Sequence, residues 1–181
     1  MKRLGMIAAA ALLLPLAASA QEAAPVANPV TSTVKAQLGR YAKNMVGAAT
    51  LMPPDKYGFK PTPEMMTFGH LVMHIAQSNG ILCSRISGAT APDTKDLKDT
   101  DPKDKLVAAL QASFEFCSTA LANVDDSKLG EPVPGFGGRT MPRAAAILAL
   151  SDDWYDHYSQ QAVYLRLNGI LPPTAQPRPA Q

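Results

Sequence analysis

The sequence predicts an all-α protein built as a single four-helix bundle. Four long segments repeat apolar side chains at steps of three and four residues, which is the period of an α-helix. Proline, glycine and short polar residues separate these segments, and no stretch shows the alternation of a convincing strand. Because each apolar stripe needs a partner to exclude water, packing four such helices together is the simplest fold.

The first 20 residues are expected to be a cleaved secretory signal peptide. Lys2 and Arg3 precede an uncharged apolar run from Met6 to Ala18, which closes on the small-x-small pattern ASA at 18–20. The run is shorter than the roughly 20 apolar residues that a membrane span needs. The sequence therefore favours a Sec-type signal and a periplasmic or secreted protein that keeps no membrane anchor after cleavage.

The first helix of the bundle is predicted over residues 29–51, after an Ala- and Pro-rich flexible lead-in over residues 21–28. Prolines at positions 53 and 54 end this helix, because proline cannot continue one. Its apolar stripe consists of Val34, Leu38, Tyr41, Met45 and Ala48.

The second helix is expected to begin after Thr67, a suitable N-cap, and to stop at Gly88. Its stripe is Phe68, Leu71, Val72, Ile75, Asn79, Leu82 and Ile86. The third helix opens at residues 101–102, since proline is tolerated in the first turn. Its stripe is Leu106, Leu110, Phe114, Cys117 and Leu121.

A glycine-rich loop is predicted from Gly130 to Gly138, followed by a fourth helix from Pro142 to Asn168. Gly169 and two further prolines prevent its continuation. The bundle is thus expected over residues 29–172 as the one domain, with a disordered tail over residues 173–181.

The charge balance argues against nucleic-acid binding. Signal cleavage removes two of the 17 Lys and Arg residues and none of the 15 Asp and Glu residues, so the mature chain is formally neutral. A neutral chain lacks the excess positive charge with which proteins neutralise phosphates. No nucleic-acid partner is expected, and the sequence is compatible with a homodimer.

The two cysteines, Cys83 and Cys117, are interpreted first as a disulfide, because an exported protein matures in an oxidising compartment. Free thiols and metal ligands are the alternatives. Cys83 lies nine residues after His74, about 180° around the second helix, which disfavours a metal shell shared by the two. A bridge between the second and third helices is the simpler account.

A metal site is suggested by histidines at helical spacing with an acidic partner. Asp153 lies four residues before His157 and shares its face of the fourth helix, whereas Asp156 is displaced by about 100°. His74 lies at the edge of the apolar stripe of the second helix. Together, His74, Asp153 and His157 would offer two nitrogens and one oxygen and leave positions open for water or substrate.

A plainer interpretation stands beside this one. Histidines at the edge of a bundle are commonly hydrogen-bonded core residues, and an Asp-x-x-x-His pair on one helix is often only a local polar pair. The residues alone leave a metal site, a small-ligand site and a purely structural bundle open.

Three stretches resemble the DinB-like superfamily of four-helix proteins, and they occur in the order expected for that family. They are MPPDKY with FKPTPE at 52–57 and 59–64, FGHLVMHIA at 68–76, and DHYSQ with YLRLNG at 156–160 and 164–169. The resemblance covers residues 30–173. It implies a divalent metal held by one His of the second helix and a His-x-x-x-His pair of the fourth.

His74 and His157 match two of these ligands, and Asp153 stands where the family has the remaining histidine. The expected ion is Zn, Ni, Fe or Mn. Gln160 is similar to a residue common at that position in the family and is a candidate for orienting the site. His70 has no place in the family's usual ligand set, which leaves it as a fourth ligand, a supporting group around the ligands or a surface residue. The resemblance also implies a metal-dependent enzyme that activates water or a low-molecular-weight thiol for a small-molecule substrate, or else a non-catalytic metal-binding bundle. The sequence identifies no catalytic residue.

Overall fold

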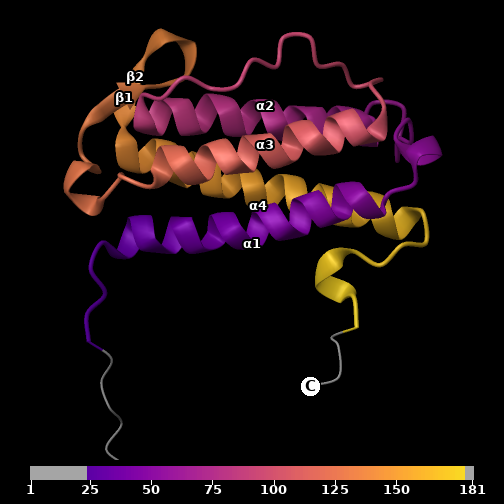
Figure 1. The fold of residues 1–181 in the computed structure, drawn as a ribbon, viewed down its shortest axis with the longest axis horizontal. Helices are drawn as coiled ribbons and strands as arrows, with labels where there is room; N and C mark the ends of the chain where they lie inside the picture. Colours follow the sequence, from indigo (N-terminus) through magenta and orange to yellow (C-terminus); the bar gives the residue numbers. More distant parts are fainter. Residues whose placement is uncertain (1–23, 178–181) are drawn as a thin grey trace, which may run out of the picture.

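The computed structural model describes residues 24–177, and this part of the chain is mostly helical (Figure 1). Its four α-helices are α1 (Pro29–Leu51), α2 (Phe68–Ser87), α3 (Lys103–Leu121) and α4 (Arg143–Leu167). Thr67 caps α2 by accepting a hydrogen bond from the backbone N–H of His70 at 3.0 Å. Gly88 ends α2 with a φ of 79°, a left-handed conformation that glycine adopts without strain. The helical prediction and these two boundary signals are confirmed.

The connections determine which helices become neighbours. Residues 88–102 run the length of the bundle beside α2, so that α3 starts at the same end as α2 (Figure 1). As a result α2 packs against α3 and α4, and α1 packs against the same two helices from the opposite side. The α2–α4 pair, which carries the predicted metal ligands, is therefore a direct contact.

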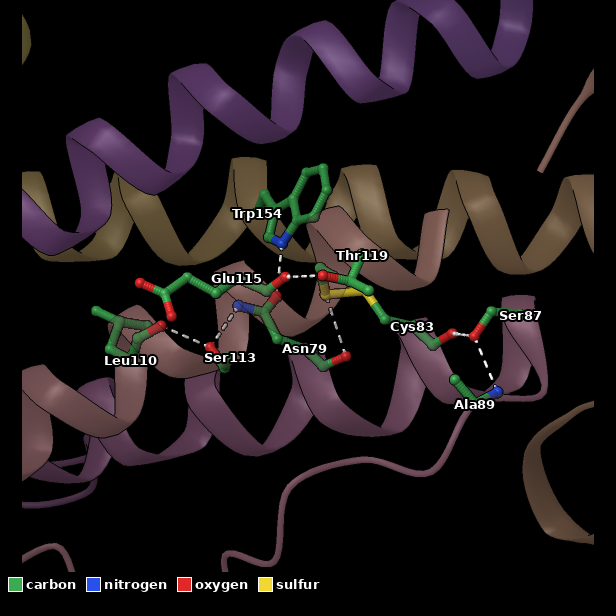
Figure 2. The surroundings of a disulfide bond; sticks show 10 residues. Asn79, Cys83, Ser87, Ala89, Leu110, Ser113, Glu115, Thr119 and Trp154 are labelled. Carbon is green, nitrogen blue, oxygen red and sulfur yellow. Dashed lines mark hydrogen bonds between the residues drawn. A yellow bond between two sulfur atoms is a disulfide. The ribbon is translucent and has the colours of Figure 1, made fainter. Parts of the chain in front are cut away.

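The core fixes how α4 is rotated about its axis. Trp154 of α4 is fully buried, and its ring centroid lies 6.1 Å from those of Tyr41 on α1 and Phe114 on α3. Its Nε1 donates to Oδ1 of Asn79 on α2 at 2.7 Å, and Asn79 in turn donates to Ser113 on α3 at 2.9 Å (Figure 2). This buried network joins three helices and sets the register between α2 and α4 next to Asp153.

A disulfide bonds Cys83 of α2 to Cys117 of α3, one helical turn from Asn79 (Figure 2). The bridge between the second and third helices was predicted from the sequence, and the structure confirms it. Both cysteines are fully buried, so neither is available to the polar face where the histidines lie.

Two segments outside the helices differ from the predictions. The glycine-rich stretch contains a short antiparallel hairpin, β1 (Pro132–Pro134) and β2 (Thr140–Pro142), with Val133 opposite Met141. Three-residue strands bounded by prolines carry too few residues to show alternation. In the predicted disordered tail, Pro173–Ala175 form a 3-10 turn that is fixed by hydrogen bonds between Thr174 and the hydroxyl of Tyr158.

The predicted signal peptide and the last four residues of the predicted tail lie outside the described residues. Within residues 24–177, no helix combines the length and the hydropathy that crossing a membrane requires.

Candidate metal centre

The contact between α2 and α4 brings His74, Asp153 and His157 together. One potential ligand atom from each residue lies within 4.8 Å of the others. The imidazole rings of His74 and His157 are stacked, with centroids 4.8 Å apart and planes inclined by 28°. These are the three residues that the spacing of the sequence had grouped, and α4 contributes two of them from one face because they are four residues apart.

The cluster lies at the edge of the core. The side chains of His157 and Asp153 are only 10% and 16% exposed to solvent, and His74 is half-buried. Trp154 points into the core, and the preceding residue, Asp153, therefore lies at the edge of the contact between α2 and α4, here called the α2–α4 seam. A carboxyl group and two imidazoles withdrawn this far from water need polar partners.

Hydrogen bonding leaves one nitrogen of His157 free. Its Nδ1 lies 2.7 Å from the backbone carbonyl oxygen of Asp153. A carbonyl oxygen can only accept, so Nδ1 carries the hydrogen and donates it, and the lone pair of Nε2 remains available. A metal-binding histidine is commonly oriented by such a bond from its other ring nitrogen.

Within the site, the carboxyl group of Asp153 has a buried oxygen without a hydrogen-bond partner among the described residues. That oxygen is Oδ2. The other oxygen, Oδ1, lies 3.7 Å from Nδ1 of His157, beyond a normal hydrogen bond. A buried carboxylate oxygen without a donor is costly, and a cation bound beside it would remove that cost.

Burial also shifts the protonation of these groups. Burial lowers the pKa of His74, the neighbouring His157 lowers it further, and the Asp153 carboxylate opposes both effects. Burial raises the pKa of Asp153, and the imidazoles of His157 and His74 oppose that rise. The shift of His74 favours the neutral imidazole, which is the form that binds a metal ion.

The donor set fits a divalent ion of the transition series. Ligands about 2.1 Å from a common tetrahedral ion stand roughly 3–4 Å apart, and the potential ligand atoms here lie within 4.8 Å of one another. Two imidazole nitrogens and one carboxylate oxygen suit zinc, iron, nickel or manganese. Three protein ligands leave further positions for water or another molecule.

The two suggested supporting residues lie farther out. Nδ1 of His70 lies 3.3 Å from a carboxylate oxygen of Asp99 in the 88–102 connection, and both side chains are about 40% exposed. Gln160 donates to Oδ2 of Asp156 at 2.8 Å. That same Asp156 oxygen is 3.9 Å from Nδ1 of His157, so Gln160 reaches the histidine only through Asp156.

Ser78 is a site residue that the sequence reasoning missed. Its Oγ lies 3.4 Å from Nε2 of His74. The signal that could have found it is the four-residue step from His74, which places both side chains on one face of α2.

Comparisons with known proteins agree with the fold. A sequence profile described as the DinB superfamily matches residues 37–160. A solved DinB-like protein from Bacillus cereus superposes with a TM-score of 0.68 at 17% identity, covering 78% of this chain and 95% of the other. A DinB-like protein from Bacillus subtilis gives 0.62 at 19% identity, with 81% and 99% covered.

A mycothiol-dependent maleylpyruvate isomerase is also similar, with a TM-score of 0.56 at 17% identity. The match covers 71% of this chain and only 59% of the isomerase. At these identities the likeness concerns the fold. Among proteins with curated functions, no similar sequence was found.

Proposed function

Because this chain belongs to the DinB superfamily, we propose that it is an exported protein that binds one divalent transition-metal ion through His74, Asp153 and His157. The observation that carries the proposal is the buried Oδ2 of Asp153, which lacks a partner beside two closely stacked imidazoles. One divalent cation would satisfy the carboxylate and a lone pair of each histidine at once.

The proposed ion is zinc, iron, nickel or manganese rather than calcium or magnesium. Calcium and magnesium prefer sites made of oxygen ligands, whereas two of the three donors here are imidazole nitrogens. Asp153 replaces a third nitrogen by a harder oxygen, which moves the preference toward iron and manganese relative to an all-histidine site.

Untagged mature protein, stripped of metal, is expected to bind one such ion per chain. At a free metal concentration 100 times the dissociation constant, binding stabilises the fold by about 2.7 kcal/mol. Calorimetric titration and thermal unfolding with and without each metal measure both quantities, and magnesium serves as the control. If none of the four metals binds at one ion per chain, the proposal is wrong, and the three residues are an ordinary polar cluster at the edge of the bundle.

A catalytic role is the second candidate, favoured by the positions that three protein ligands leave open. A bound divalent ion supplies a Lewis acid that lowers the pKa of a water or thiol placed on it. The likeness to a mycothiol-dependent isomerase supports a low-molecular-weight thiol as the co-substrate. Screening the metal-loaded protein with thiols and electrophilic substrates separates this role from metal binding alone, which gives no turnover.

Export is part of the proposal because two features support it. The first 20 residues have the composition of a signal peptide, and the buried Cys83–Cys117 disulfide is typical of oxidising compartments. Mass spectrometry of the full chain expressed in a bacterium is expected to find a periplasmic protein that begins at Gln21. A cytosolic protein that retains residues 1–20 would contradict this.

A further inference from the structure

Arg85 of α2 carries a charge that no described residue neutralises. Its Nη1 is buried and has no hydrogen-bond partner among the described residues. Within residues 24–177, no carboxylate lies close enough to form an ion pair with it. Withdrawing a charged donor from water is costly unless an acceptor or an opposite charge faces it. The unpaired guanidinium is thus a candidate for binding an anion from outside the chain.

Arg143, a second arginine at this end of the bundle, is paired within the fold. It donates to a carboxylate oxygen of Glu131 at 2.8 Å and to the backbone carbonyl of Ile86, the residue after Arg85. Arg143 thereby joins the start of α4 to the end of α2, where the β1–β2 hairpin also lies (Figure 1). Glu131 is engaged by this pair, and Arg85 has no corresponding partner among the described residues.

An aromatic ring orients the guanidinium of Arg85. Its Cζ lies 4.3 Å from the ring centroid of Phe136, which is a cation–π contact. Phe136 belongs to the turn of the β1–β2 hairpin, where the backbone N–H of Arg139 donates to its carbonyl oxygen at 3.3 Å. Gly137 and Gly138 shape this turn with φ of 62° and 74°, a region that favours glycine. The ring is 56% exposed, so the turn presents it to solvent beside Arg85 instead of packing it into the core.

A carboxylate fits a guanidinium held in this way. With its face against a ring, the planar group presents its N–H donors at the edges, and the two oxygens of a carboxylate can accept two parallel bonds from such an edge. Arg85 is only partly buried, so a ligand can approach from the side that still meets solvent. One cation also matches the single charge of a carboxylate better than the nearly two charges of a phosphate monoester at neutral pH.

We propose that Arg85 and Phe136 form a binding site for the carboxylate of a small organic acid. The site lies on the face of α2 that carries His74, because eleven residues make about three turns and return to within about 20° of the same direction. The two residues are about 16 Å apart along the helix axis, so a short acid held at Arg85 does not reach the metal centre. The site therefore needs no ion and goes beyond the proposed metal-binding function.

The test titrates metal-free, untagged protein with benzoate at constant ionic strength and follows the Nε–H signal of Arg85 and the backbone N–H signal of Phe136 by NMR. The wild type is expected to show saturable shifts of both signals. Arg85→Gln removes the charged donors and should bind benzoate about 10–100 times more weakly. Arg85→Lys keeps the charge but loses the planar fork, so its affinity should lie between the two.

Arg40→Ala is the matched control for the Arg85 variants. The guanidinium of Arg40 also lies over a ring, 4.8 Å from the centroid of Tyr41, but Arg40 is exposed to solvent. Its removal should leave the benzoate affinity unchanged. Phe136→Leu should weaken binding by about 2–5-fold, and Phe136→Tyr, which keeps a ring over the guanidinium, should restore it.

The outcomes separate this site from the metal centre. Loading the protein with zinc should leave the benzoate-induced shifts at Arg85 and Phe136 unchanged, and a chain that binds no metal should still bind benzoate. The absence of saturable shifts in the wild type, or equal affinity in Arg85→Gln, overturns the proposal. Tighter binding of inorganic phosphate or sulfate than of benzoate overturns its assignment to a carboxylate.

Discussion

Replacing His157 by alanine is expected to abolish stoichiometric metal binding. The substitution removes one of only three protein ligands, and the ring it removes is the one already oriented by its bond to the Asp153 carbonyl. We expect the affinity to fall by more than the roughly 100-fold that marks the upper end of losses from supporting residues. Equilibrium dialysis followed by elemental analysis measures the change.

His70→Ala is the matched control for this variant. His70 is also a histidine, lies one turn from His74, and pairs with Asp99 rather than with the cluster. Its removal should leave one ion per chain. If His157→Ala binds metal as tightly as His70→Ala and the wild type, then His157 is not a ligand and the proposed centre is wrong.

Removing the Cys83–Cys117 disulfide is expected to cost about 4 kcal/mol of unfolding free energy. The bridge spans 34 residues, and closing a loop of this length restricts the unfolded chain by about that amount in the chain-entropy model. The double variant Cys83→Ala, Cys117→Ala should therefore unfold at a much lower urea concentration than the oxidised wild type. Its m-value should rise, because the unlinked chain exposes more surface on unfolding.

Reducing agent provides the control for the disulfide. It should lower the stability of the wild type toward that of the double variant and leave the double variant unchanged. Because the bridge joins α2 to α3 and lies away from the α2–α4 seam, the folded double variant should still bind metal. Equal urea midpoints for the oxidised wild type and the double variant would contradict the stabilising role.

The helices could be predicted because their signals are local. Proline positions gave the bounds of α1, and Thr67 and Gly88 gave those of α2. The hairpin could not be found in this way, since its pairing of Val133 with Met141 depends on a turn of consecutive glycines rather than on any strand-like run. The ordered start of the tail depends on Tyr158, a contact that local composition does not encode.

The spacing of residues along the sequence also predicted much of the candidate site. The four-residue step between Asp153 and His157 guarantees a shared face, and the placement of His74 required only that α2 and α4 be neighbours. The partner of His70 could not be predicted, because Asp99 belongs to a long connection whose path is set by tertiary packing. The role of Asn79 was hidden for the same reason: it sits in an apolar stripe, and only the fold shows Trp154 opposite it.

Anomalous X-ray diffraction from crystals grown with cobalt or zinc tests the central claim most directly. We predict a single strong peak at the α2–α4 seam, about 2.0–2.2 Å from a nitrogen of His74, a nitrogen of His157 and a carboxylate oxygen of Asp153. Density at the partly exposed His70 alone, or no peak between the two stacked imidazoles, would contradict it.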